Sequence, residues 1–160
     1  MILNYSTQDV IENKKSIFLA GPIPREKGST NWRMDAIKLF EKYKYDGLLY
    51  IPQDEAGLIV DGDQDETKWE LKALAIAKKI MFWVPREFPA MLGLTTNVEF
   101  GMWIQSKKVI YGRPDNALMI DYLDLLYEKY YHQKPENNLD DLIKKSVIEV
   151  NEEYRSVKNA

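Results

Sequence analysis

The feature that most constrains the fold is a short run at residues 80–84, Ile-Met-Phe-Trp-Val, which is apolar at every position. A strand with one face toward water alternates apolar and polar residues, so this run indicates a strand buried on both faces. Such burial is typical of a parallel sheet, and we expect this strand to be central. Similar largely apolar runs lie at residues 16–20, 47–51, 109–111 and 117–120.

Helical patterns separate most of these runs. Ser29, Thr30 and Asn31 supply capping side chains ahead of an apolar helical stripe. Further helices are expected at about 67–78, after 95–96, at 121–131 and at 139–154. This order predicts an α/β fold: a doubly wound parallel sheet of about five strands, with helices on both faces and an extra C-terminal helix. At 160 residues, the chain is expected to form a single domain, residues 1–160.

Composition excludes several classes of function. A net charge of -3 does not supply the basic face that attracts a nucleic acid polymer, so we expect a small-molecule substrate. The chain has no cysteine, which excludes a thiolate nucleophile and a thiolate metal site. No apolar run approaches the length that spans a bilayer, and the start lacks a signal-peptide pattern, so a cytoplasmic location is expected.

Chemically unusual residues follow three of the expected strands. Ligands of open α/β sheets bind beyond the carboxyl ends of the strands, where the loops enter the following helices. There the chain carries residues 21–25 (Gly-Pro-Ile-Pro-Arg), a long acidic loop leading to Trp69 and Glu70, and a segment containing Glu99. These segments are therefore expected to meet at one edge of the sheet.

The two glutamates have two interpretations. Glu70 and Glu99 each follow a threonine by three residues, Thr67 and Thr96, which matches a capping box. A carboxylate bonded back to its own helix start cannot also attack a substrate. A helix N-terminus also lowers a carboxylate pKa, which keeps the group ionised and nucleophilic at neutral pH. The residues alone leave both interpretations open.

Three ordered segments resemble the nucleoside 2-deoxyribosyltransferase superfamily. They are Phe-Leu-Ala-Gly-Pro at 18–22, Trp-Glu at 69–70 ahead of Ile-Met-Phe-Trp at 80–83, and Thr-Thr-Asn-Val-Glu-Phe-Gly at 95–101. The resemblance spans about residues 17–122, and the motif around Glu99 is its specific part. The best-studied members carry an aspartate before this motif that contacts the base. No aspartate lies between Trp83 and Glu99, so base recognition is expected to differ.

The resemblance implies a flavodoxin-like domain that makes or breaks an N-glycosidic bond in a nucleoside. Glu99 would be the nucleophile that attacks the anomeric carbon, and a second nucleobase would then take the sugar from the glycosyl-enzyme. Glu70 would assist the leaving base, with Asp65 as a weaker candidate for that role. Two carboxyl groups that act directly on one bond with retention lie about 5 Å apart. The implied reaction needs no metal and no organic cofactor.

The remaining candidates would shape the substrate pocket. Gly21, Pro22 and Arg25 would line the sugar side, although Gly21 and Pro22 also suit a simple strand terminator. Asn97 is a candidate for a hydrogen bond to a sugar hydroxyl, and Trp69 for a pocket wall against the base. Relatives complete their sites across subunits, which implies a homo-oligomer.

Two other functions remain open. The first is a hydrolase of the same superfamily, in which water resolves the glycosyl intermediate of a nucleoside or a nucleoside monophosphate. Arg25, Ser29 and Arg86 would then hold the phosphate. The second is a non-catalytic nucleotide-binding domain in which Glu70 and Glu99 are only capping residues.

Overall fold

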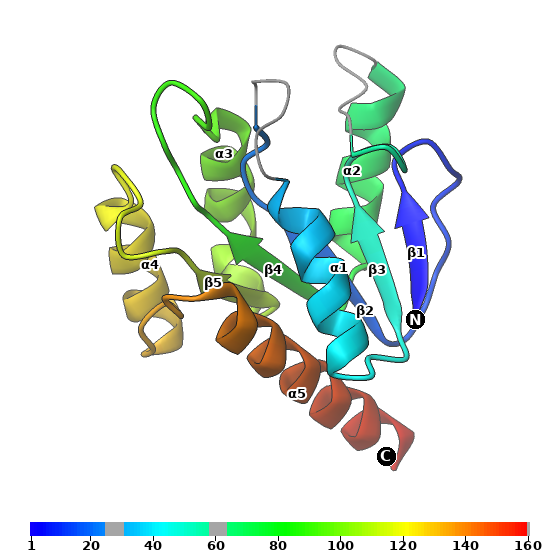
Figure 1. Ribbon diagram of the computed structural model, residues 1–160. Helices are drawn as coiled ribbons and strands as arrows, with labels where there is room; N and C mark the ends of the chain where they lie inside the picture. Colours follow the sequence, from blue (N-terminus) through cyan, green and yellow to red (C-terminus); the bar gives the residue numbers. More distant parts are fainter. Residues whose placement is uncertain (25–30, 58–63, 160) are drawn as a thin grey trace.

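The computed structural model describes residues 1–24, 31–57 and 64–159. Within these residues, a sheet of five parallel strands runs in the order β1-β3-β2-β4-β5 (Figure 1). The strands are β1 (Ile2–Tyr5), β2 (Ser16–Ala20), β3 (Leu48–Ile51), β4 (Lys79–Trp83) and β5 (Val109–Gly112). The predicted α/β fold with a parallel, flavodoxin-like sheet is confirmed.

Helices cover both faces of the sheet. The helices are α1 (Trp32–Lys42), α2 (Gln64–Ile76), α3 (Leu94–Trp103), α4 (Asp121–Tyr131) and α5 (Leu139–Lys158), with a 3-10 turn at Ile104–Ser106. Residues of α1 and α5 pack on one face, and residues of α2, α3 and α4 pack on the other (Figure 1). None of the described helices is long and apolar enough to cross a membrane.

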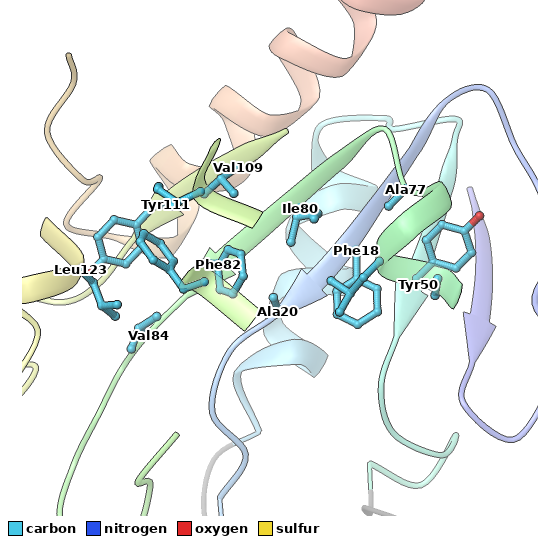
Figure 2. Packing of buried hydrophobic residues seen from close by; sticks show 14 of the residues in the cluster. Phe18, Ala20, Tyr50, Ala77, Ile80, Phe82, Val84, Val109, Tyr111 and Leu123 are labelled. Carbon is cyan, nitrogen blue, oxygen red and sulfur yellow. The ribbon is translucent and has the colours of Figure 1, made fainter. Parts of the chain in front are cut away.

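Alternate residues of the inner strands fill two separate cores. In β2, Phe18 faces the helices α2, α3 and α4, whereas Leu19 faces α1 and α5. In β4, Phe82 faces α2, α3 and α4, and Met81 faces α1 and α5. All four of these side chains are at most 1% exposed. Figure 2 shows the first of these cores, which contains Phe18 and Phe82. Burial on both faces explains why these strands are apolar at every position.

The predicted set of strands needs two corrections, because one predicted strand does not form and one strand was not predicted. Residues 117–120 do not form a strand: Ala117 and Leu118 bond to loop carbonyls, and Met119 is exposed with a positive φ of 50°. The fifth strand is β1, which pairs with β3 at the edge of the sheet and was missed because only part of it is buried. The run at 80–84 forms β4, which is an interior strand of the sheet. The middle strand of the five is β2.

The helix starts agree with the predictions except at α2 and at α3, which was expected after residues 95–96 and begins at Leu94. Asn31 caps α1, because its side-chain oxygen accepts a hydrogen bond from the Arg33 backbone N–H at 3.1 Å. Ser29 and Thr30 lie outside the described residues. Helix α2 begins at Gln64, three residues before the predicted start, so Asp65 and Glu66 belong to its first turn. Acidic side chains are favourable there because they face the positive end of the helix dipole.

The ends of β2 and β4 meet at the point where the strand order reverses. The chain runs from β2 to β3 on one side and then crosses to β4 on the other side of β2. Gly21 follows β2 with φ +148°, and a Cβ atom on it would lie 2.1 Å from the carbonyl oxygen of Trp83. Such a reversal is the usual ligand site of this sheet type, and here only glycine fits.

We expect Gly21→Ala to lower the free energy of unfolding by about 2–4 kcal/mol, because the new methyl group would displace the Trp83 carbonyl. Urea unfolding measures this change. Gly101→Ala is the matched control, since a Cβ on this residue of α3 meets no atom within 4 Å. Alanine there should raise stability by about 0.5–1 kcal/mol through its better helix propensity. Equal effects of the two substitutions would contradict the close approach at Gly21.

Candidate functional site

The loop after β2 contacts both α1 and the turn before α3. The carbonyl oxygen of Pro22 accepts a hydrogen bond from the Trp32 indole N–H at 2.9 Å. On the other side, a Cβ atom on Gly93 would lie 3.0 Å from the Cβ of Pro22. Pro22 and Gly21 are both buried. Two of the predicted site residues therefore join helices from opposite faces of the sheet at its carboxyl edge.

Neither glutamate belongs to a capping box. Helix α3 begins at Leu94 with Gly93 as its N-cap, so Thr96 is the third residue of the helix and Glu99 the sixth. Thr67 lies inside α2, and Glu70 is the seventh residue of that helix. The capping interpretation is therefore wrong for both glutamates. Both side chains are half-buried and lie beyond the first turn, where the effect of a helix terminus has faded.

Burial reverses the expected direction of the Glu99 pKa. Removal from water and, to a lesser extent, the neighbouring charge of Glu70 raise the pKa of Glu99, while Arg33 opposes the rise, and the resulting pKa is about 8. Burial also raises the pKa of Glu70 against the effect of Arg33, with Glu66 adding to the rise. At pH 7, Glu99 is thus mostly protonated in the ligand-free protein. Of the effects considered from the sequence, the helix terminus therefore does not set the pKa of Glu99, because burial dominates it.

Arg33 is a charged residue of this cluster that the sequence reasoning missed. Its side chain is 1% exposed, its Nε donates to the Leu19 carbonyl at 3.1 Å and its Nη2 to the Gly21 carbonyl at 2.8 Å. The signal was available, because residue 33 shares the buried helical face of Ala36, Ile37 and Phe40. An arginine within an apolar stripe indicates a buried charge that needs a partner.

Asn97 is held by a second buried arginine. The Asn97 side-chain oxygen accepts a hydrogen bond from Nη2 of Arg86, and Nη1 of Arg86 donates to the Met119 carbonyl at 2.7 Å. Arg86 is 4% exposed, whereas Asn97 is exposed. Arg86 thus connects the segment after β4 with the start of α3 and the segment after β5.

The other predicted residues lie in different surroundings. Trp69 is buried in the core, with its ring centroid 6.3 Å from those of Phe18 and Tyr50. Asp65 is exposed in the first turn of α2 and forms an ion pair with Lys68 at 2.8 Å. Arg25 and Ser29 lie outside the described residues, as do residues 58–63 of the acidic loop.

A cavity of about 440 Å³ lies at the same edge of the sheet, and its lining includes Arg86 but not Arg33, Glu70 or Glu99. Its walls come from the start of α1, the end of β4 and the segments after β4 and β5. They include Trp32, Asp35, Trp83, Arg86, Glu87 and Leu118. The Trp32 ring connects the cavity to the charged cluster, because the Arg33 guanidinium lies 4.6 Å from its centroid. This volume lies within the range of pockets for small molecules.

A comparison with protein families identifies the family of the chain. The model of a family described as nucleoside 2-deoxyribosyltransferase like matches residues 14–117. The chain belongs to this family. The matched region runs from β2 through β5 and contains Arg33, Glu70 and Glu99, whereas β1, α4 and α5 lie outside it. None of the curated proteins compared with the chain matches it.

Membership of the nucleoside 2-deoxyribosyltransferase-like family confirms the resemblance predicted from the three sequence segments. All three segments lie inside the match. The roles of the individual site residues stay predictions.

We expect the stabilising effect of Glu99→Gln to grow with pH. Below about pH 4.5, the ordinary value, Glu99 is protonated in the folded and the unfolded chain alike. Between that pH and about 8, the folded protein keeps a proton that the unfolded chain releases, so wild-type stability falls as pH rises. Glutamine avoids this loss. The Tm of the variant relative to wild type should therefore rise by at least about 4 °C from pH 4.5 to pH 8.5.

Thermal unfolding followed by circular dichroism at several pH values measures this difference. Glu152→Gln, at an exposed position of α5, is the matched control and should shift Tm by the same small amount at every pH. A Tm difference for Glu99→Gln that stays constant from pH 4.5 to 8.5 would show that burial does not raise the pKa of Glu99.

Proposed function

We propose that the protein cleaves the N-glycosidic bond of a deoxynucleoside and transfers the sugar to another nucleobase through a covalent glycosyl-Glu99 intermediate. The observation that carries this proposal is a pair of half-buried glutamates, Glu70 and Glu99, whose charges interact and whose helices α2 and α3 pack on the same face of the sheet of a nucleoside 2-deoxyribosyltransferase-like chain. Retaining glycoside chemistry needs such a pair, since one carboxylate attacks while the other carboxyl group protonates the leaving group.

In the first step, a carboxylate oxygen of Glu99 attacks the anomeric carbon. The bond from that carbon to the base nitrogen breaks, its electron pair stays on the base, and the base takes a proton from Glu70. In the second step, a nitrogen of the acceptor base attacks the same carbon, the Glu99 ester bond breaks, and Glu70 recovers a proton from the acceptor. Two displacements at one carbon retain its configuration.

The raised pKa of Glu70 supports its role as the acid. A carboxyl group must hold a proton near neutral pH to act as an acid, and burial raises the pKa of Glu70 in that direction. Glu99 must be ionised to attack, so it first has to lose the proton that its raised pKa favours in the ligand-free protein. We infer that this proton passes to Glu70 when the substrate displaces water from the site.

The surrounding residues would receive the substrate. The segment with Gly21 and Pro22 lies between α1 and α3, where the sugar would contact its backbone. The side chain of Asn97 is fixed by Arg86, which suits a hydrogen bond to a sugar hydroxyl. Arg25, Asp65 and Trp69 stay predictions as substrate-binding residues, and the packing of Trp69 in the core gives its predicted role no support.

A homo-oligomer is also part of the proposal. Helix α3 carries three exposed apolar side chains, Leu94, Val98 and Met102, which are spaced by four residues and share one helical face. Exposed apolar stripes of this kind mark protein interaction surfaces. An association through α3 would lie on the same helix as Glu99.

Purified protein incubated with 2'-deoxyinosine should form a new deoxynucleoside only when free adenine or cytosine is present, as measured by chromatography. Glu99→Gln should lower the rate by at least about a thousandfold, because it removes the nucleophile. Glu70→Gln should lower it by about 10²- to 10⁴-fold, because it removes the acid. Glu152→Gln on the exposed face of α5 should leave the rate unchanged.

The alternatives give different products. Free base released at the same rate without an acceptor would identify a hydrolase, and release from nucleoside monophosphates alone would point to phosphate recognition. If neither wild type nor Glu99→Gln turned over any nucleoside or nucleoside monophosphate, the result would contradict the proposal and favour a non-catalytic binding domain.

A further inference from the structure

The proposed reaction leaves one buried charge of the site without a role. Arg33 lies on α1, on the face of the sheet opposite to α2 and α3, yet its charge acts on glutamates from both of those helices. The side chain reaches the carboxyl end of β2, where Nε and Nη2 donate to the carbonyls of Leu19 and Gly21. These two hydrogen bonds fix the guanidinium in place.

The hydrogen bonds to carbonyls do not neutralise the arginine. Its third nitrogen, Nη1, is buried and has no hydrogen-bond partner among the described residues. A cation that is 1% exposed is unfavourable unless an opposite charge lies close to it. The charged groups that face it are Glu70 from α2 and Glu99 from α3, and Glu66 acts on Glu70 in turn.

We propose that Arg33 is a positioning residue that supplies a fixed positive charge to the Glu70 and Glu99 pair, so that either carboxyl group can carry the negative charge. This inference rests on the proposed function. Before attack, the negative charge belongs to Glu99 and the proton to Glu70. After attack, Glu99 is a neutral ester and Glu70 is the anion, because its proton has left with the base.

The arginine thus compensates the same single charge on both sides of the step. Neither carboxyl group needs water to stabilise it, and the guanidinium does not have to move. Its side chain is suited to this, because an arginine stays protonated although burial lowers its pKa to about 10, a change that Glu70 and Glu99 oppose.

The test is the pKa of Glu99 in the ligand-free protein, measured by ¹³C NMR titration of carboxyl-labelled glutamate, with Glu99→Gln to assign the resonance. We expect Arg33→Met to raise this pKa by about one unit, because the substitution removes the opposite charge that lowers it. Arg33→Lys, which keeps the charge, should move it less than half as far. An unchanged pKa in a folded Arg33→Met variant would overturn the inference.

Arg86→Met is the matched control. Arg86 is also a buried arginine at the carboxyl edge that donates to backbone carbonyls, but its charge is not among those that act on Glu99. Its removal should leave the pKa of Glu99 within about half a unit of the wild-type value. A rise equal to that of Arg33→Met would overturn the specific role of Arg33.

Wild-type protein provides a second measurement in case Arg33→Met does not fold. The guanidinium ¹⁵N resonances of Arg33 should shift with pH at the same midpoint as the Glu99 carboxyl resonance. Guanidinium resonances that do not change across the Glu99 midpoint would overturn the inference.

Both measurements are independent of turnover, so the two proposals can fail separately. A raised Glu99 pKa in Arg33→Met, together with no activity of wild type on any nucleoside, would support the charge pairing and reject the proposed function. Nucleoside transfer by wild type, together with an unchanged Glu99 pKa in Arg33→Met, would support the proposed function and reject the charge pairing.

Discussion

The end of β2 lies so close to β4 that residue 21 has no room for a side chain, and the geometry of the site depends on this approach. The Gly21 carbonyl accepts from Arg33, which ties α1 to the end of β2. The next residue, Pro22, contacts Gly93 in the turn before α3. One short segment after the middle strand therefore connects helices from both faces of the sheet and brings an arginine into range of two glutamates.

The same arrangement makes an unfavourable electrostatic contribution to the stability of the folded protein. Two carboxyl groups removed from water repel each other when both are ionised, and one arginine balances only one of them. The protein therefore keeps a proton on Glu99 at a pH where an exposed glutamate has lost it. Stability lost in this way is common at functional sites, where groups are held in states that folding alone would not favour.

Sequence patterns predicted most of the sheet because the inner strands are buried on both faces. Residues 16–20 and 80–84 do not alternate between apolar and polar side chains, which indicates strands buried on both faces. Asn31 caps α1 as expected. The patterns failed where burial is partial or local signals coincide. The edge strand β1 is half-polar, residues 117–120 are apolar but form no strand, and the acidic residues 65 and 66 begin a helix rather than end a loop.

The candidate glutamates could be selected from the sequence, but their environment could not. Thr67 and Thr96 mimic capping boxes, and only the observed helix starts show that neither threonine is a cap. Arg33 was detectable as a charge within the apolar stripe of α1. Its proximity to Glu70 and Glu99 depends on how three helices on two faces approach one edge, which no local pattern encodes.

The central claim is that the sugar becomes bonded to Glu99, and trapping that bond tests it most directly. A 2'-fluoro analogue of the deoxynucleoside substrate should react slowly, because fluorine disfavours the positive charge that develops on the sugar in both steps. Peptide mass spectrometry after digestion should then find one fluorinated sugar on the peptide that contains Glu99. That label should disappear when a free nucleobase is added. A label on Glu70, or turnover of the parent nucleoside with no labelled peptide from the analogue, would contradict the account.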